Sequence, residues 1–148
     1  MKNWYRIAQR IAQNMQDIER IALEVRQSFL TDDDDTLKAM CLPVSRELKK
    51  RLLAAGFNTA IVVQGVFQID EPDPSAYADW DINDFENEEE MDSAKYTPLH
   101  YWVEVKDLIV DVTADQFNDE LIDEEMAPII IEHISSANRY TAIHKDWI

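Results

Sequence analysis

The first thirty residues alternate apolar and polar positions with the period of an α-helix. Apolar side chains recur at spacings of three and four with Arg, Gln, Asp and Glu between them, which predicts one amphipathic helix over residues 3–30. The apolar stripe consists of Trp4, Ile7, Ile11, Met15, Ile18, Ala22, Val25 and Phe29. Because the spacing is also close to a heptad repeat, a dimerising coiled coil is an alternative. We favour packing on the chain's own domain, since a chain of 148 residues needs this face for its core.

A second helix and a buried strand are predicted next. The helix covers residues 43–55, with an apolar stripe formed by Val44, Leu48, Leu52 and Ala55. Pro43 suits a first helical turn, and Gly56 supplies the left-handed residue that commonly ends a helix. Because proline biases the residue before it away from helical dihedral angles, Cys41 is expected just ahead of the helix. The apolar, β-branched run at residues 59–67 predicts the strand.

Two more strands, residues 99–105 and 108–113, are predicted to form a hairpin joined at Lys106–Asp107. With a two-residue turn, directly opposed residues share a face of the sheet and the faces alternate along each strand. One face is almost wholly apolar and is expected to pack on the core; it carries Tyr101, Val103, Val105, Leu108, Val110 and Val112. The other face is expected to be open; it carries His100, Trp102, Glu104, Ile109, Asp111 and Thr113.

The remaining elements complete an α+β fold in which helices pack on an antiparallel sheet. Residues 114–125 are predicted as a turn or short helix, residues 128–132 as a short strand, and the tail adds a last strand. The length indicates a single domain over residues 1–148. It is interrupted by an acidic loop insertion at about residues 68–97, within which residues 70–92 hold eleven Asp or Glu and no basic side chain.

The net charge of −16 limits the classes of partner. Such a surface repels nucleic-acid phosphates and anionic membranes, so we expect neither, while a basic protein or peptide partner is electrostatically acceptable. A single cysteine and a charged N-terminus without a secretory apolar run indicate a reducing, cytoplasmic setting. The sequence leaves the oligomeric state open.

No cofactor and no metal are expected. With two glycines in the chain, there is no Gly-rich cradle for a nucleotide. The acidic loop places Asp79, Asp81, Asn83 and Glu90 at EF-hand spacing. However, Asp84 stands where the calcium loop needs glycine, so we favour a solvated lid or a docking strip.

Three separated residues carry candidate chemistry: Cys41, His100 and Asp111. A thiol near a helix start lies where the helix dipole stabilises thiolate. In the hairpin register above, His100 and Asp111 are diagonal neighbours roughly 7–8 Å apart at Cα. The carboxylate can then fix one imidazole nitrogen and leave the other for the thiol, which is the arrangement that nucleophilic acyl chemistry needs. Trp102, beside His100, is a candidate wall of a substrate groove.

These pieces resemble the papain-like and transglutaminase-like superfamily of cysteine enzymes. The resemblance covers about residues 38–117: Cys41 followed by LPVSRELKKRLLAAG, then LHYWVEV and LIVDVTADQF. It implies an α+β fold whose nucleophile-bearing helix packs on an antiparallel sheet bearing His and then Asp. By position it implies that Cys41 is the nucleophile, His100 the base and later acid, and Asp111 the orienting residue. The implied substrate is a protein or peptide amide or a thioester, without a cofactor.

Two matters stay open at this level. No glutamine stands a few residues upstream of Cys41, where papain-type peptidases keep a donor for the oxyanion, so the second donor is unassigned. Gln116, Gln27 and Gln64 are candidates by residue type. The alternative function is a non-enzymatic acidic module, such as an inhibitor or immunity protein, that docks a basic partner through the acidic loop.

Overall fold

A computed structural model of the chain has an α+β architecture, as the sequence predicts. It describes residues 2–30, 37, 40–68, 99–118, 121 and 125–145. In chain order these hold the helices α1 (Lys2–Phe29) and α2 (Cys41–Ala54), the strands β1 (Ile61–Phe67), β2 (Leu99–Val105) and β3 (Leu108–Asp111), the 3₁₀ turn η3 (Ala114–Phe117), β4 (Ile130–His133), the 3₁₀ turn η4 (Ile134–Ser136) and β5 (Tyr140–Lys145).

The strands form one antiparallel sheet in the order β4-β3-β2-β1-β5. β1 therefore lies between β2 and the C-terminal strand β5, with a register shift against β5 between Gln64 and Gly65. The predicted short strand and the predicted last strand are both present, as β4 and β5. The strand predicted at residues 108–113 ends at Asp111, because the next residues turn away into η3.

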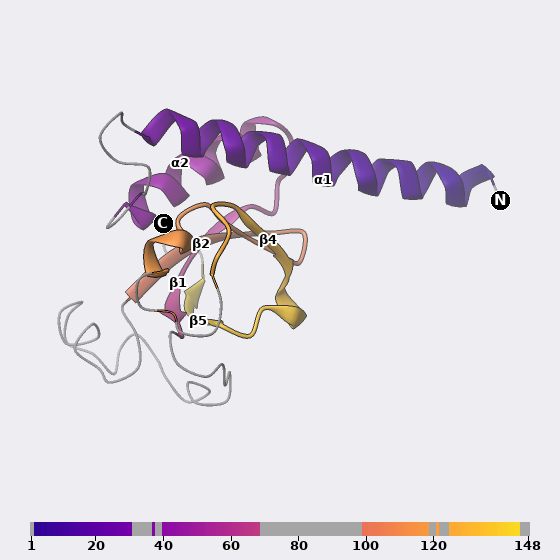
Figure 1. Ribbon diagram of the computed structural model, residues 1–148. Helices are drawn as coiled ribbons and strands as arrows, with labels where there is room; N and C mark the ends of the chain where they lie inside the picture. The colour runs from indigo at the N-terminus through magenta and orange to yellow at the C-terminus, as the bar shows by residue number, and fades with distance from the viewer. Residues whose placement is uncertain are drawn as a thin grey trace.

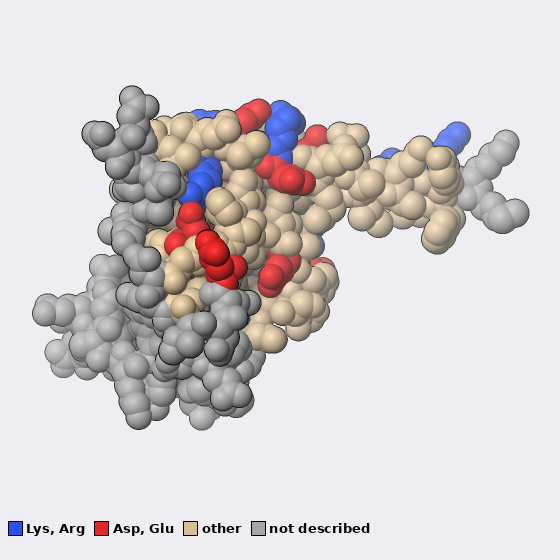
Figure 2. Space-filling view, viewed as in Figure 1, with Lys and Arg blue, Asp and Glu red and all other residues tan. Residues whose placement is uncertain are grey.

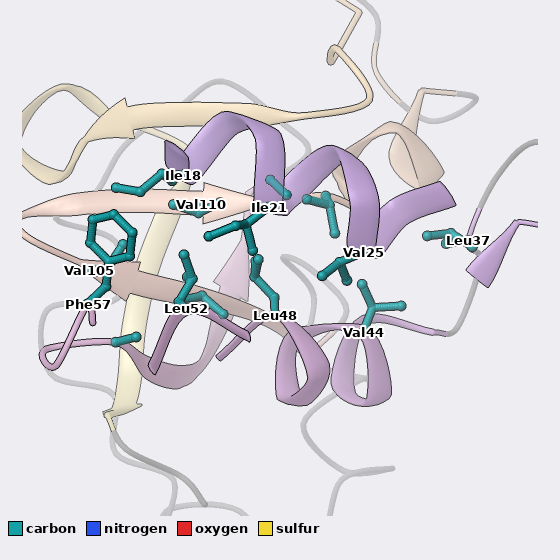
Figure 3. Close-up of a cluster of buried hydrophobic side chains, with 14 residues drawn as sticks. Ile18, Ile21, Val25, Leu37, Val44, Leu48, Leu52, Phe57, Val105 and Val110 are labelled. Atoms are coloured by element: carbon teal, nitrogen blue, oxygen red, sulfur yellow. The ribbon is translucent and has the colours of Figure 1, made fainter. Parts of the chain in front are cut away.

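Both helices lie on the same side of the sheet (Figure 1). Their apolar stripes meet the apolar face of the β2–β3 hairpin, which confirms the prediction for that face. Figure 3 shows side chains of α1, α2 and the hairpin pointing toward one another in this core. Its members are Ile18, Ile21, Ala22, Val25, Leu37, Val44, Leu48, Leu52, Phe57, Ala60, Val103, Val105, Val110 and Val112.

The opposite face of the sheet is also covered, which corrects the expectation of an open face. A second apolar core packs there, and it includes Trp102 and Ile109 of the hairpin. Its other members all come from segments before and after the hairpin: Val63, Phe67, Ala114, Phe117, Met126, Ile130, Ala137 and Tyr140. His100 and Asp111 lie on this buried side, with 0% and 1% of their surfaces exposed.

The helix α2 begins two residues earlier than predicted, so Cys41 lies inside its first turn. Pro43 costs this turn little, because the first N–H groups of a helix have no intrahelical acceptor and proline lacks only such a group. The first i to i−4 bond follows directly, from Val44 N to Met40 O at 3.0 Å. Gly56 ends the helix with a φ of 96°, as predicted.

The single-domain prediction stays a prediction. The acidic loop predicted at about residues 68–97 lies outside the described residues except for Gln68, and so do the residues at EF-hand spacing. Within the part of the chain that is described, no helix combines the length and apolarity needed to cross a membrane.

Candidate active site

The β2–β3 hairpin brings His100 and Asp111 together. Its turn consists of Lys106 and Asp107, both with positive φ (49° and 63°), as a tight two-residue hairpin turn requires. The strands pair with Val105 opposite Leu108, which is the predicted even register. His100 Nε2 lies 2.7 Å from Asp111 Oδ2 in consequence.

Asp111 accepts four hydrogen bonds. Its Oδ2 receives the bond from His100 and a second one, of 2.8 Å, from the Tyr140 hydroxyl. Its Oδ1 receives the backbone N–H of Thr113 at 2.9 Å and the Thr113 hydroxyl at 3.2 Å. Burial alone raises the pKa of Asp111, but the charge of His100 and the hydrogen bonds from His100, Thr113 and Tyr140 lower it below its ordinary value. Asp111 is therefore an ionised, fully hydrogen-bonded carboxylate.

His100 is enclosed by aromatic rings. Phe117 and Phe67 meet the imidazole edge-on, with ring centroids 5.0 and 5.9 Å away. Trp102 and Tyr140 lie at 5.9 and 6.4 Å. This packing, together with the bond to Asp111, fixes the ring and leaves it no freedom to rotate.

The two nitrogens of the imidazole have different roles. Nε2 donates to the ionised Asp111, whereas Nδ1 has no partner in hydrogen-bonding geometry among the described residues. Burial lowers the pKa of His100, but the charge and hydrogen bond of Asp111, with smaller contributions from Cys41, raise it to about 10. The ring is therefore an imidazolium at neutral pH, and Nδ1 is the nitrogen available for proton exchange.

Cys41 approaches this imidazole from the first turn of α2. Its thiol is near enough to contribute by hydrogen bonding and by charge to the raised pKa of His100. The contact stops short of a well-formed hydrogen bond, because within the described part of the chain Nδ1 has no partner in suitable geometry. Cys41 is half-buried and packs with Leu42 against Val62, Val66 and Tyr101.

The structure thus brings together the three residues that the sequence singled out. The structure shows where these residues lie, and their chemical roles are proposed below.

Trp102 is in a different place from the one expected. Its side chain is 1% exposed, and its indole Nε1 donates to Glu104 Oε2 at 3.2 Å. Its six-membered ring lies over Gly65, the residue opposite His100 on β1. The indole therefore supports the imidazole and offers no wall to a groove in this structure.

The second oxyanion donor stays unassigned. Gln116, in η3, donates its side-chain amide to Thr113 O at 3.0 Å. Gln64 is buried on β1 and donates to the Tyr101 hydroxyl at 3.0 Å, and Gln27 is exposed on α1. The backbone N–H of Cys41, in the first helical turn, is suited to be one donor because it has no intrahelical acceptor.

Sequence reasoning missed the residues that hold His100 and Asp111 in position. Thr113 follows Asp111 by two positions, and an Asp that bonds the backbone two residues on is a recognisable local signal. Tyr140, Phe67 and Phe117 carry no such signal. Their approach to His100 depends on how β1, η3 and β5 assemble around the hairpin.

Comparisons with protein-family models, with curated proteins and with solved structures found no match. The described residues contain no group of three or more His, Cys, Asp or Glu side chains placed to hold a metal ion.

Proposed function

We propose that the protein is a cysteine-dependent acyl-transfer enzyme acting on an amide or thioester bond of a protein or peptide. The Cys41 thiolate attacks the carbonyl carbon, and the His100 imidazolium gives the Nδ1 proton to the leaving amine or thiol. Water or an amine then attacks the thioester, His100 takes its proton, and the Cys41 sulfur leaves with the electron pair. Asp111 holds His100 in place throughout.

One observation carries this proposal: the two nitrogens of a buried imidazole are used differently. Nε2 is bound to a carboxylate at 2.7 Å, whereas Nδ1 has no partner in hydrogen-bonding geometry among the residues that the structure describes, and a half-buried thiol lies nearby. A purely structural histidine would satisfy both nitrogens, since an unpaired buried polar atom is costly.

The helix and sheet arrangement supports the finer fold assignment as well. A nucleophile at the start of a helix that packs on antiparallel strands, with His and then Asp on neighbouring strands, is what a papain-like or transglutaminase-like core requires. We propose that the chain has such a core and that it needs no cofactor.

Two probes of general chemistry test the proposal without knowledge of the substrate. Iodoacetamide should label Cys41 in the native protein at pH 7, as read by mass spectrometry. p-Nitrophenyl acetate should release about one equivalent of p-nitrophenol per chain in a burst, the signature of acyl-enzyme formation. Cys41→Ala should abolish the burst, and His100→Gln should slow both labelling and burst by roughly a hundredfold or more.

The matched control is His144→Gln, because His144 is an exposed histidine in β5. It should change neither rate. A thiol that reacts only after unfolding in urea, together with no burst, would overturn the proposal and leave the acidic binding module as the better explanation.

A further inference from the structure

The apolar stripe of α1 is buried along the C-terminal half of the helix and exposed along the N-terminal half. In the C-terminal half, Ile18 and Val25 are buried in the core between the helices and the sheet. In the N-terminal half, Trp4, Ile7 and Ile11 are 74%, 56% and 59% exposed. Figures 1 and 2 show this half projecting from the body. We call residues 4–16 the arm; its length is about 20 Å.

The arm differs from the rest of the chain in charge. It contains Arg6 and Arg10 and no Asp or Glu. Because the whole chain carries −16 and the arm +2, the remainder carries −18. The acidic side chains begin directly where the arm joins the body, with Asp17, Glu19 and Glu24. The arm therefore combines exposed apolar side chains with a positive charge, whereas the rest of the chain is strongly acidic.

An exposed stripe of this kind needs a partner. An isolated amphipathic helix gains little from propensity alone, and most helical stability comes from packing of the apolar face. Trp4, Ile7, Ile11 and Met15 follow one another at spacings of three, four and four, which matches the seam between two paired helices.

We propose that the arm pairs with the arm of a second copy of this chain, in antiparallel orientation, to form a symmetric dimer. In this orientation, with Trp4 of one copy level with Met15 of the other, Arg6 lies level with Gln13 and about one helical turn from Asp17 of the other copy. The basic tip of each arm therefore approaches the acidic base of the partner arm. The helix dipoles are then also opposed.

A parallel pair fits the structure poorly. It would set Arg6 directly against Arg6, which the antiparallel pair separates. It would also make the bodies collide, because in each chain the stripe that faces the partner continues directly onto its own core. An anionic membrane suits the arm itself, but the −18 of the rest of the chain opposes it.

The first experiment measures the mass of the full-length protein by sedimentation equilibrium over a range of concentrations. The wild type should be a dimer. Ile7→Gln combined with Ile11→Gln should weaken association by more than about a hundredfold, because it removes two buried isoleucines from each side of the interface. Circular dichroism should show that the variant keeps its fold, since both positions lie outside the core.

The matched control is Leu23→Gln, because Leu23 is an exposed apolar residue of α1 that is off the stripe. It should leave the dimer intact. A wild type that stays monomeric at all concentrations overturns the proposal. So does a monomer that binds phosphatidylglycerol vesicles through the arm, since the occupant would then be a membrane.

The second experiment tests orientation in a Cys41→Ser background. Trp4→Cys and Met15→Cys chains are mixed and oxidised. Antiparallel pairing predicts disulfides between position 4 of one chain and position 15 of the other, whereas 4–4 and 15–15 disulfides would overturn it. Because Cys41 is absent from these chains, the result does not depend on the proposed chemistry.

Discussion

At the residue scale, the charge state of His100 depends on Asp111. Burial is the largest influence and lowers the pKa of His100, and the charge and hydrogen bond of Asp111 lead the contributions that reverse it, to about 10. Asp111→Asn should therefore bring the pKa of His100 below its ordinary value of 6.5, because burial then acts against weak opposition. NMR titration of the imidazole carbons measures this directly.

Asp107→Asn is the control, because Asp107 lies exposed in the hairpin turn. It should leave the His100 titration unchanged. A pKa that stays near 10 in Asp111→Asn would contradict the assignment of the charge partner.

The ion pair between His100 and Asp111 contributes to the free energy of unfolding only within a limited pH range. The folded state raises the pKa of His100, so this contribution is complete below pH 6.5 and is lost as the pH rises through about 10. The folded state lowers the pKa of Asp111, so its contribution is complete above the ordinary value of 3.8 and is lost as the pH falls below it. In Asp111→Asn, urea unfolding should show roughly 3–5 kcal/mol less stability near neutral pH and no fall of this origin at alkaline pH.

At the element scale, β1 lies so close to the β5 backbone and to the Trp102 ring at one point that only glycine fits. A Cβ on Gly65 would lie 2.2 Å from Thr141 O and 2.5 Å from the Trp102 ring. Gly65→Ala should cost roughly 3 kcal/mol, because a backbone oxygen on β5 and a buried indole must both move. It should also shift the NMR signals of His100, which lies opposite Gly65.

Gly56→Ala is the matched control. Gly56 has a φ of 96° and open space around its Cβ position, so alanine there suffers backbone strain of about 1–2 kcal/mol without a collision. Thermal unfolding should rank Gly65→Ala as the less stable variant, and only Gly65→Ala should perturb the imidazole. If both variants lose the same stability and the NMR signals of His100 do not change, the close packing at Gly65 does not position His100.

The elements could largely be predicted from sequence, because the signals involved are local. The period of α1, the glycine after α2 and the even register of the hairpin each depend on a few neighbouring residues. The start of α2 was misplaced because the local bias before Pro43 is weaker than the packing of α2 on the sheet. The covered second face could not be foreseen, because Phe67, Phe117 and Tyr140 reach His100 from three separate segments.

At the scale of the whole molecule, Arg26 ties the helical layer to the chain that leaves the site. Its guanidinium binds both oxygens of Asp115, at 3.0 and 2.7 Å, and also donates to Val112 O at 2.6 Å and Pro128 O at 3.1 Å. Arg26→Lys should lower the free energy of unfolding by about 3 kcal/mol, because an ammonium cannot reproduce this planar set of donors and leaves buried acceptors unpaired. Urea denaturation measures the loss.

Arg20→Lys provides the comparison on the same helix. Arg20 pairs with Asp17 at 3.7 Å and with Glu24 at 3.6 Å, but its side chain is 60% exposed. Its replacement should change stability by less than about 0.5 kcal/mol. Similar losses in the two variants would mean that Arg26 contributes charge alone and does not act as a fixed link.

The four hydrogen bonds of Asp111 have a consequence for synthesis of the chain. Two of its donors, His100 and Thr113, are made within a dozen residues of it, but the third, Tyr140, emerges from the ribosome much later. A growing polypeptide that has passed Asp111 therefore holds the carboxylate incompletely until β5 is translated and docks beside β1. Until then, the His100 imidazole is bound to a carboxylate that lacks one of its three partner residues.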